Sequence, residues 1–162
     1  MNYQSLLEIK DDYQRAYQLV SILFQDKTDK EGEPYIGHLE RVSNKLTKEN
    51  TRIAGLLHDV VEDTELTFND LRKLNFNEEI IELVNLVTNT TKDKSYHDKI
   101  TSIIESNNIE AIKLKYSDMS DNANPERLSK LPEEKRNYFI NKYQPELIRL
   151  KNILKERGEN LW

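Results

Sequence analysis

The apolar residues of this chain recur at intervals of three and four, which is the period of an amphipathic α-helix. The densest such stretch is Ile53–Thr64, whose apolar face is formed by Ile53, Leu56, Leu57, Val60 and Val61. A helix with this face is expected to lie in the protein interior. We therefore predict a central helix from about Asn50 to Asp63, around which the rest of the chain is organised.

Helical patterns continue on both sides of this stretch. Thr67-Phe-Asn-Asp70 has the spacing of a capping box, and Asn77 and Ser95 are suited to cap the two helices that follow. Residues 88–94 are predicted to form a loop. The predicted helices cover residues 3–25, 36–48, 50–63, 67–74, 77–87, 95–105, 109–122 and, from 132 to 157, a pair separated by Pro145.

Composition agrees with an all-α fold. Only four Gly and four Pro interrupt the 162 residues, and no long run alternates apolar with polar positions. A chain of this size buries roughly 68–70% of its unfolded surface, enough for one core. Since no repeat or long linker divides it, residues 1–162 are predicted to form a single domain.

Charge and cysteine content restrict the functional classes. The net charge of -5 and the pI near 5.3 argue against a surface that binds nucleic acid or an anionic membrane. No apolar run of about 18 residues and no signal-peptide pattern is present, so the cytoplasm is the expected compartment. Because there is no cysteine, any metal ion must be held by nitrogen and oxygen.

The second half of the predicted central helix carries His58, Asp59, Glu62 and Asp63. Spacings of three and four residues place the three carboxylates on one side of a continuous helix, where like charges repel. They also lie near the helix C-terminus, where the macrodipole disfavours anions. Local conflict of this kind is typical of functional sites, and it indicates half of a metal site.

Two further candidates are ambiguous when taken alone. In the predicted helix over 109–122, Lys115, Asp118 and Asn122 share one face beside an apolar stripe. Asp118 and Asn122 are equally compatible with a solvated or capping role, and His38 with a surface position at a helix start. His97, in a polar setting, is interpreted as a surface residue.

The order of these blocks changes the interpretation. Four blocks follow one another with their apolar frame intact: Tyr35-Ile-Gly-His38, Ala54 to Thr64, Leu83 to Thr88 and Ile112 to Asn122. Together they resemble the HD superfamily of metal-dependent phosphohydrolases, over residues 10 to 130. More narrowly, they resemble the hydrolase domain of RelA/SpoT-type enzymes and small stand-alone alarmone hydrolases.

This resemblance implies an all-α HD-type helical bundle with one divalent metal ion, commonly Mn²⁺, with Fe²⁺, Co²⁺, Mg²⁺ or Zn²⁺ as alternatives. The implied metal ligands are His38, His58, Asp59 and Asp118. The acidic pair Glu62 and Asp63 is implied to orient and deprotonate the attacking water. The implied substrate-binding residues are Lys30 and Asn122, with Lys27 and Lys115 as cations for a polyphosphate.

The activity implied is removal of the 3′-pyrophosphate from a (p)ppGpp-like nucleotide. Alternatives are another nucleotide phosphatase or nucleotidase on the same scaffold, and a nucleotide-sensing module without turnover. The intact pair Glu62-Asp63 argues against the sensor. The expected partner is a small nucleotide, and residues 132–162 either pack on the core or mediate a homodimer.

The chain departs from the family pattern near the substrate. Asp29-Lys30 stands where an Arg-Lys pair is usual, Ser117-Asp118-Met119 replaces Ala-Asp-Arg, and Asp121 precedes Asn122. Replacing Arg by Asp29 removes a bidentate group and is expected to place a negative charge facing an anionic substrate. The implied metal set is intact, whereas the implied substrate contacts are altered.

Overall fold

The computed structural model describes residues 3–89 and 91–162, which form an all-α fold. Within them no β-strand is assigned, and Thr28 and Pro34 form an isolated β-bridge. The helices are η1 (Gln4–Glu8), α1 (Asp12–Leu23), α2 (Ile36–Asn44), α3 (Glu49–Leu57), α4 (Val60–Asp63), α5 (Phe68–Lys73), α6 (Glu78–Val87), α7 (Tyr96–Glu105), α8 (Ile109–Asn122), α9 (Pro125–Ser129) and α10 (Glu133–Glu156). The predicted fold class is confirmed.

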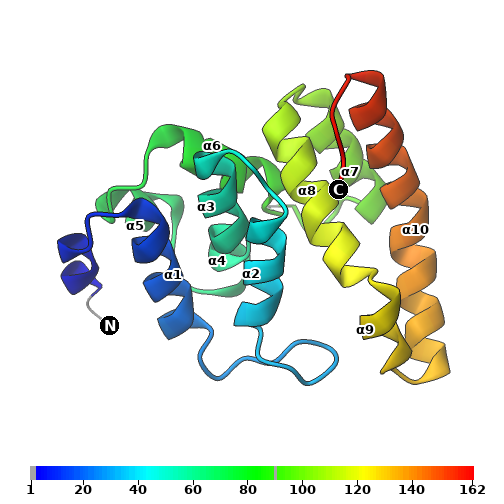
Figure 1. The fold of residues 1–162 in the computed structure, drawn as a ribbon, viewed down its shortest axis with the longest axis horizontal. Coiled ribbons are helices and arrows are strands. Elements are labelled where there is room, and N and C mark those ends of the chain that lie inside the picture. The colour runs from blue at the N-terminus through cyan, green and yellow to red at the C-terminus, as the bar shows by residue number, and fades with distance from the viewer. Residues whose placement is uncertain (1–2, 90) are drawn as a thin grey trace.

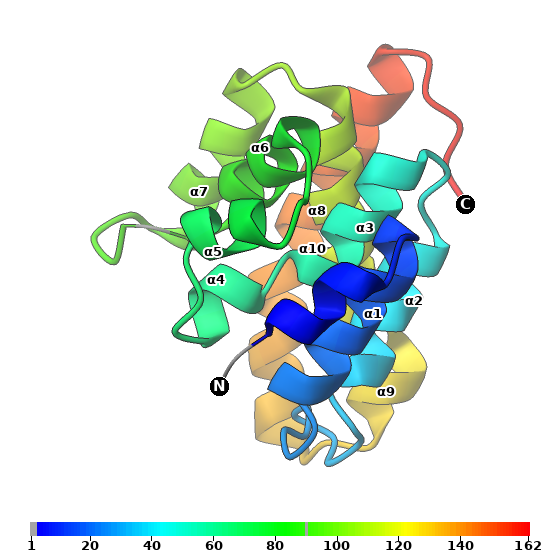
Figure 2. The same ribbon diagram turned by 90° about the vertical axis from the view of Figure 1, so that its left-hand side faces the viewer.

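Helix α3 is the centre of the packing. It contacts α1, α2, α6 and α8, which surround it in Figures 1 and 2. Most of its residues are buried, including Ile53, Leu56 and Leu57. A helix that is apolar on nearly every side is stable only inside such a ring of neighbours.

Gly55 allows α2 and α3 to approach closely. A Cβ atom at this position would lie 3.0 Å from the Cα of Ser43 in α2, which is backbone and cannot move aside as a flexible side chain would. This close packing brings His38, in α2, next to the C-terminal end of α3.

The predicted central helix is interrupted at His58 and Asp59, so the expectation of one helix from Asn50 to Asp63 is wrong. The ring Nδ1 of His58 donates to the carbonyl of Gly55 at 2.7 Å. In a continuous helix that carbonyl would accept from the amide of Asp59. The side chain therefore competes with the backbone, and α4 starts after the interruption.

Two other predicted helices have different boundaries in the structure. The first predicted helix is divided into η1 and α1, because Asp11 caps α1 by accepting from the amide of Gln14 at 2.7 Å. The second ends at Asn44 rather than at residue 48, since the chain turns there and buries Leu46 in the core.

The two helices expected around Pro145 form the single helix α10, which runs along one edge of the molecule beside α8 (Figure 1). Tyr143, Leu150 and Leu154 are buried on both sides of the proline. Packing of this helix against α7, α8 and α9 outweighs the one backbone hydrogen bond that proline removes.

Several local predictions are confirmed. Thr67 and Asp70 form a capping box, and Asn77 and Ser95 cap α6 and α7. The described residues of the predicted 88–94 segment are not helical, and Thr90 lies outside the described residues. Across the described ranges, no helix has the length and apolar character needed to cross a membrane.

Candidate active site

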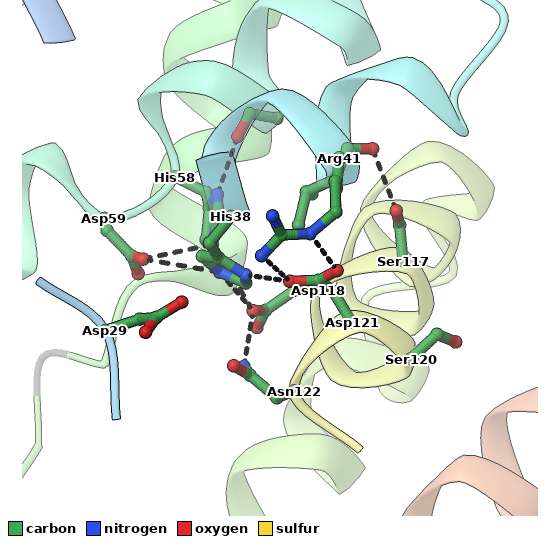
Figure 3. Close-up of polar contacts among 12 residues, drawn as sticks. Asp29, His38, Arg41, His58, Asp59, Ser117, Asp118, Ser120, Asp121 and Asn122 are labelled. Carbon is green, nitrogen blue, oxygen red and sulfur yellow. Dashed lines mark hydrogen bonds and ion pairs between the residues drawn. The ribbon is translucent and has the colours of Figure 1, made fainter. Parts of the chain in front are cut away.

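Three buried side chains from three helical segments meet beside the end of α3. His38 comes from α2, His58 follows α3, and Asp118 comes from α8 (Figure 3). Asp118 Oδ1 lies 3.2 Å from Nε2 of His38 and 3.4 Å from Nε2 of His58. One ligand atom of each residue lies within 4.8 Å of the others, so the group could hold a metal ion.

The second nitrogen of each imidazole is fixed by a hydrogen bond. His58 Nδ1 faces the carbonyl of Gly55, which can only accept, so this nitrogen carries the proton. His38 Nδ1 lies 2.7 Å from a carboxylate oxygen of Asp121, which accepts in the same way. In both neutral rings Nε2 is then unprotonated and directed at Asp118, as metal coordination requires.

Asp59 lies at the edge of this group. Its Oδ2 is 3.2 Å from Nε2 of His58 and 3.9 Å from Nε2 of His38, and it accepts a hydrogen bond from the hydroxyl of Tyr35. All four predicted ligands are therefore brought together, although Asp59 has a protein donor on the oxygen that faces the histidines.

Asp118 has two further partners besides the histidines, one cationic and one polar. Lys115 donates to its Oδ2 at 2.8 Å, and Asn122 donates to its Oδ1 at 2.9 Å. Burial opposes ionisation of Asp118, but the charges of Lys115 and His58 outweigh burial and lower its pKa well below the usual value. The sequence-predicted face of Lys115, Asp118 and Asn122 is thus a connected group.

The neighbouring carboxylates act on the histidines in the opposite sense. Burial lowers the pKa of His58, but the charges of Asp59 and Asp118 outweigh it and raise the pKa to about 9. For His38, burial is outweighed by hydrogen bonds to Asp118 and Asp121, which raise its pKa. Without a metal ion, the acids therefore hold protons on the imidazoles.

Glu62 and Asp63 point to different places, contrary to the expected crowding of three acids on one helix face. Glu62 accepts from the amide of Asn89 at 3.1 Å, whereas Asp63 pairs with Lys27. Burial raises the pKa of Glu62, and Asp59 adds to the effect. The interruption at residues 58 and 59 separates the acids.

A cleft of about 330 Å³ adjoins Glu62 and Lys115. Its lining also includes Lys94, Lys99 and Lys142, together with uncharged donors. Burial lowers the pKa of Lys142, and the charges of Lys115 and Lys99 lower it further, as expected where cations lie close together. An acidic protein thus presents a cationic surface that reaches the histidine site through Lys115, the partner of Asp118.

The loop before α2 carries Lys30 and Asp29. Lys30 Nζ donates to the carbonyl of Asn122 at 2.9 Å and lies 4.9 Å from the ring centroid of Phe139. The expectation that Asp29 places a negative charge facing the substrate is corrected, because an ion pair offsets this charge inside the fold. Its side chain is 4% exposed and accepts from Arg127 at 2.8 Å.

Sequence reasoning missed the residues that support the ligands. Tyr35 binds Asp59, and Asp121 binds both His38 and Arg41. A helical signal for them exists, since Tyr35 lies three residues before His38 and Asp121 three residues after Asp118. In the sequence, Asp121 is visible only as a departure from the family pattern.

The donor set fits a divalent cation. His58 Nε2 is buried and has no hydrogen-bond partner, although the carboxylates of Asp59 and Asp118 lie 3.2 and 3.4 Å away. A buried polar atom without a partner is costly, and coordination of a cation would satisfy it. Two imidazole nitrogens with carboxylate oxygens suit a first-row divalent metal.

An all-α fold with a buried His and Asp group defines the class of helical metal-site proteins, and comparison identifies the family. The family model described as HD domain matches residues 16–119, and the chain belongs to this family. This match confirms the resemblance inferred from the sequence. The hydrolases of this family are metal-dependent.

Curated relatives and a solved structure agree with this assignment. A guanosine-3′,5′-bis(diphosphate) 3′-pyrophosphohydrolase of Aquifex aeolicus is 35% identical over 69% of this chain and 17% of its own length. One of Drosophila melanogaster is 42% identical over 44% of this chain and 41% of its own. A solved structure, described as a metazoan ortholog of SpoT that hydrolyzes ppGpp, superposes with a TM-score of 0.70 at 26% identity.

The extent of these matches differs. The solved structure is matched over 97% of its chain and 92% of this one. In contrast, the chain spans less than a fifth of the length of the Aquifex relative.

Proposed function

We propose that this protein is a metal-dependent phosphohydrolase that removes the 3′-pyrophosphate from (p)ppGpp-like guanosine nucleotides. The observation that carries the proposal is the convergence of His38, His58 and Asp118, with the Nε2 atoms of both histidines directed at Asp118, beside a lysine-lined cleft. The activity named for the Aquifex and Drosophila relatives and for the structural neighbour supports the same substrate class.

The proposed ligands are His38, His58, Asp59 and Asp118, and the proposed ion is Mn²⁺. When bound, the ion supplies Lewis-acid polarisation of a phosphoryl oxygen and a water of lowered pKa. Asn122 and Lys115 keep the Asp118 carboxylate ionised and oriented. Asp121 and the Gly55 carbonyl keep both imidazoles in the coordinating tautomer.

Glu62 is proposed as the proton acceptor. Its raised pKa suits a general base better than the strongly lowered pKa of Asp118 does. Water attacks the phosphorus joined to the 3′ oxygen, and the P–O3′ bond breaks. The proton taken by Glu62 passes to O3′, so the products are pyrophosphate and a nucleotide with a free 3′-hydroxyl. Asp63 is proposed to orient the water, although its present partner is Lys27.

Lysines provide the complementary charge for the substrate. We assign Lys30, Lys27 and Lys115 to its phosphates and Asn122 to its sugar. Burial lowers the pKa of Lys30, and the charge of Arg127 lowers it further, so an incoming phosphate would relieve an unfavourable environment for this cation. The cytoplasm is the proposed compartment, and homodimerisation stays a prediction.

The direct test is turnover by the purified protein with Mn²⁺. Substrates are ppGpp, GTP and GMP, and the measured products are pyrophosphate and orthophosphate. Release of pyrophosphate from ppGpp, lost on chelation and in Glu62→Gln, supports the proposal. Hydrolysis restricted to monophosphates favours a nucleotidase. Binding of ppGpp without any product, alike in wild type and Glu62→Gln, favours a sensor.

A further inference from the structure

A single arginine connects the loop that carries Lys30 to the end of α8. Arg127 Nη2 donates at 2.8 Å to Asp29 Oδ2 and at 2.8 Å to Glu31 Oε2. Its Nη1 donates to the Asp121 carboxylate and, at 3.0 Å, to the Asp121 carbonyl. The side chains of the three acids are 4%, 1% and 1% exposed, in that order, so Arg127 joins carboxylates withdrawn from water.

One part of this network, which we call the metal arm, leads to the proposed metal centre. The Asp121 oxygen bound by Arg127 is also the one that lies 2.7 Å from Nδ1 of His38. Arg41 donates to the other oxygen at 2.7 Å and to this same oxygen at 3.2 Å (Figure 3). The carboxylate is therefore fixed from two sides and presents one defined acceptor to the imidazole. Partners of this kind orient a metal-binding histidine and set its tautomer.

The other part, the loop arm, leads to the loop that carries Lys30, which we call the substrate loop. Asp29 Oδ1 accepts from the amides of Glu31 and Glu33, at 3.0 and 2.9 Å, and Asp29 Oδ2 is held by Arg127. Lys30 lies between these anchored residues and reaches the carbonyl of Asn122, in the same turn of α8 as Asp118. The position of the Lys30 ammonium thus depends on the attachment of its loop to Arg127.

We propose that Arg127 is a positioning residue that holds both the metal ligand His38 and the substrate loop, His38 through Asp121 and the loop through Asp29 and Glu31. The inference rests on the metal centre proposed above but not on the identity of the nucleotide. Only a planar guanidinium presents several donors in fixed directions, so lysine is not equivalent at this position. Asp29 and Asp121, the two acidic departures from the family pattern, converge on this group.

The metal arm is tested by titrating Mn²⁺ alone into the metal-free full chain, with free Mn²⁺ followed by its EPR signal. Loss of a group that orients a metal ligand typically costs about 10–100-fold in metal affinity, and we expect this range for Arg127→Met and for Asp121→Asn. Because both act through His38, the double variant should lose no more than the weaker-binding single variant. Arg149→Met is the matched control, since Arg149 pairs with the buried Glu146.

The loop arm is tested by hydrogen exchange of the amides of residues 28–33. Asp29→Asn retains an oxygen for the amides of Glu31 and Glu33 and loses the ion pair with Arg127. We expect faster exchange in Asp29→Asn and Arg127→Met, with Mn²⁺ affinity unchanged in Asp29→Asn. In Asp121→Asn the loop exchange should stay as in wild type. A residue needed only for folding would not separate the two readouts in this way.

Arg127→Lys keeps the charge and covers the case in which Arg127→Met does not fold. It should bind Mn²⁺ more weakly than wild type and exchange faster in the loop. A folded Arg127 variant with Mn²⁺ affinity within twofold of wild type and unchanged loop exchange overturns the inference. So does a double variant whose losses multiply. If wild type itself binds no Mn²⁺, the metal centre and the metal arm both fail, and loop exchange alone then decides the second arm.

Discussion

Saturation with Mn²⁺ should raise the melting temperature, and the change of one ligand should remove this effect. A ligand at 100 times its Kd stabilises the native state by about 2.7 kcal/mol. For chains of 150–250 residues, each kcal/mol shifts the melting temperature by roughly 2–4 °C. For this protein of 162 residues the expected rise is therefore roughly 5–11 °C relative to protein in EDTA.

The structure predicts which variants keep the shift. His58→Ala removes the buried nitrogen that lacks a hydrogen-bond partner, so the variant should not respond to Mn²⁺. Asp118→Asn should also fail to respond. In addition, its metal-free form should be less stable than wild type by about 3–5 kcal/mol, because Lys115 loses its buried anionic partner. Glu62→Gln should keep the full shift, since Glu62 faces Asn89 rather than the histidines.

Differential scanning fluorimetry with Mn²⁺ or EDTA measures all four proteins under one condition, and elemental analysis confirms the metal content before stripping. The reasoning is refuted if wild type that contained metal melts at the same temperature after its removal. A shift in His58→Ala as large as that of wild type would equally show that the ion binds elsewhere.

Four further outcomes can be measured separately. Glu62→Gln should lower kcat on ppGpp by about 10²–10⁴-fold with Mn²⁺ affinity retained, and an unchanged kcat would exclude it as the base. Lys30→Met should raise KM by roughly 10- to 100-fold, since a hydrogen bond to a charged group contributes about 1.5–3 kcal/mol; an unaltered KM contradicts its assignment. Gly55→Ala should cost about 1–3 kcal/mol in urea unfolding and weaken Mn²⁺ binding, because α2 and α3 must separate, and wild-type values for both would contradict this. Burial opposes ionisation of Glu110, but a hydrogen bond from Thr51 helps to lower its pKa below the usual 4.5. The ionised Glu110 therefore contributes its full stabilisation of the fold above pH 4.5, and this contribution is lost as the pH falls through the lowered pKa of the folded state. The urea midpoint of Glu110→Gln should lie below that of wild type at pH 7, with the gap closing toward pH 3; a gap independent of pH refutes this linkage.

The helix boundaries can be predicted from the sequence wherever they depend only on interactions between residues near in the chain. Polar caps at Thr67, Asn77 and Ser95 satisfy backbone amides of their own helices, and they occur as predicted. Asp11 caps α1 by the same rule, but the apolar residues before it suggested that the helix had already begun. Pro145 predicts a break where the structure has one continuous helix. Burial of the residues on both sides of the proline is a tertiary effect, and helix propensity does not include it.

The meeting of His38, His58 and Asp118 is predictable because these residue types are distinctive and recur in a family order. The contacts that support these residues are not. The contact between His38 and Asp121 spans 83 residues, and that between Asp29 and Arg127 spans 98. Whether two such residues meet depends on how the end of α8 lies against the loop before α2, which no periodicity encodes. The sequence therefore predicts a negative charge of Asp29 facing the substrate, whereas its carboxylate is paired with Arg127 inside the fold.

The interruption between α3 and α4 explains how neighbouring acids take different chemical roles. Asp59 extends toward the histidines, and Glu62, three residues later, extends toward Asn89 and the lysine-lined cleft. Their surroundings also separate the two acids of the proposed mechanism, since Asp118 has a strongly lowered pKa and Glu62 a raised one. Carboxylates whose pKa values are driven apart are suited to different tasks, one to bind a cation and one to accept a proton. A continuous helix would have kept Asp59 and Glu62 on one face. The hydrogen bond from His58 to the Gly55 carbonyl accompanies the interruption of the helix, and the same bond orients the imidazole.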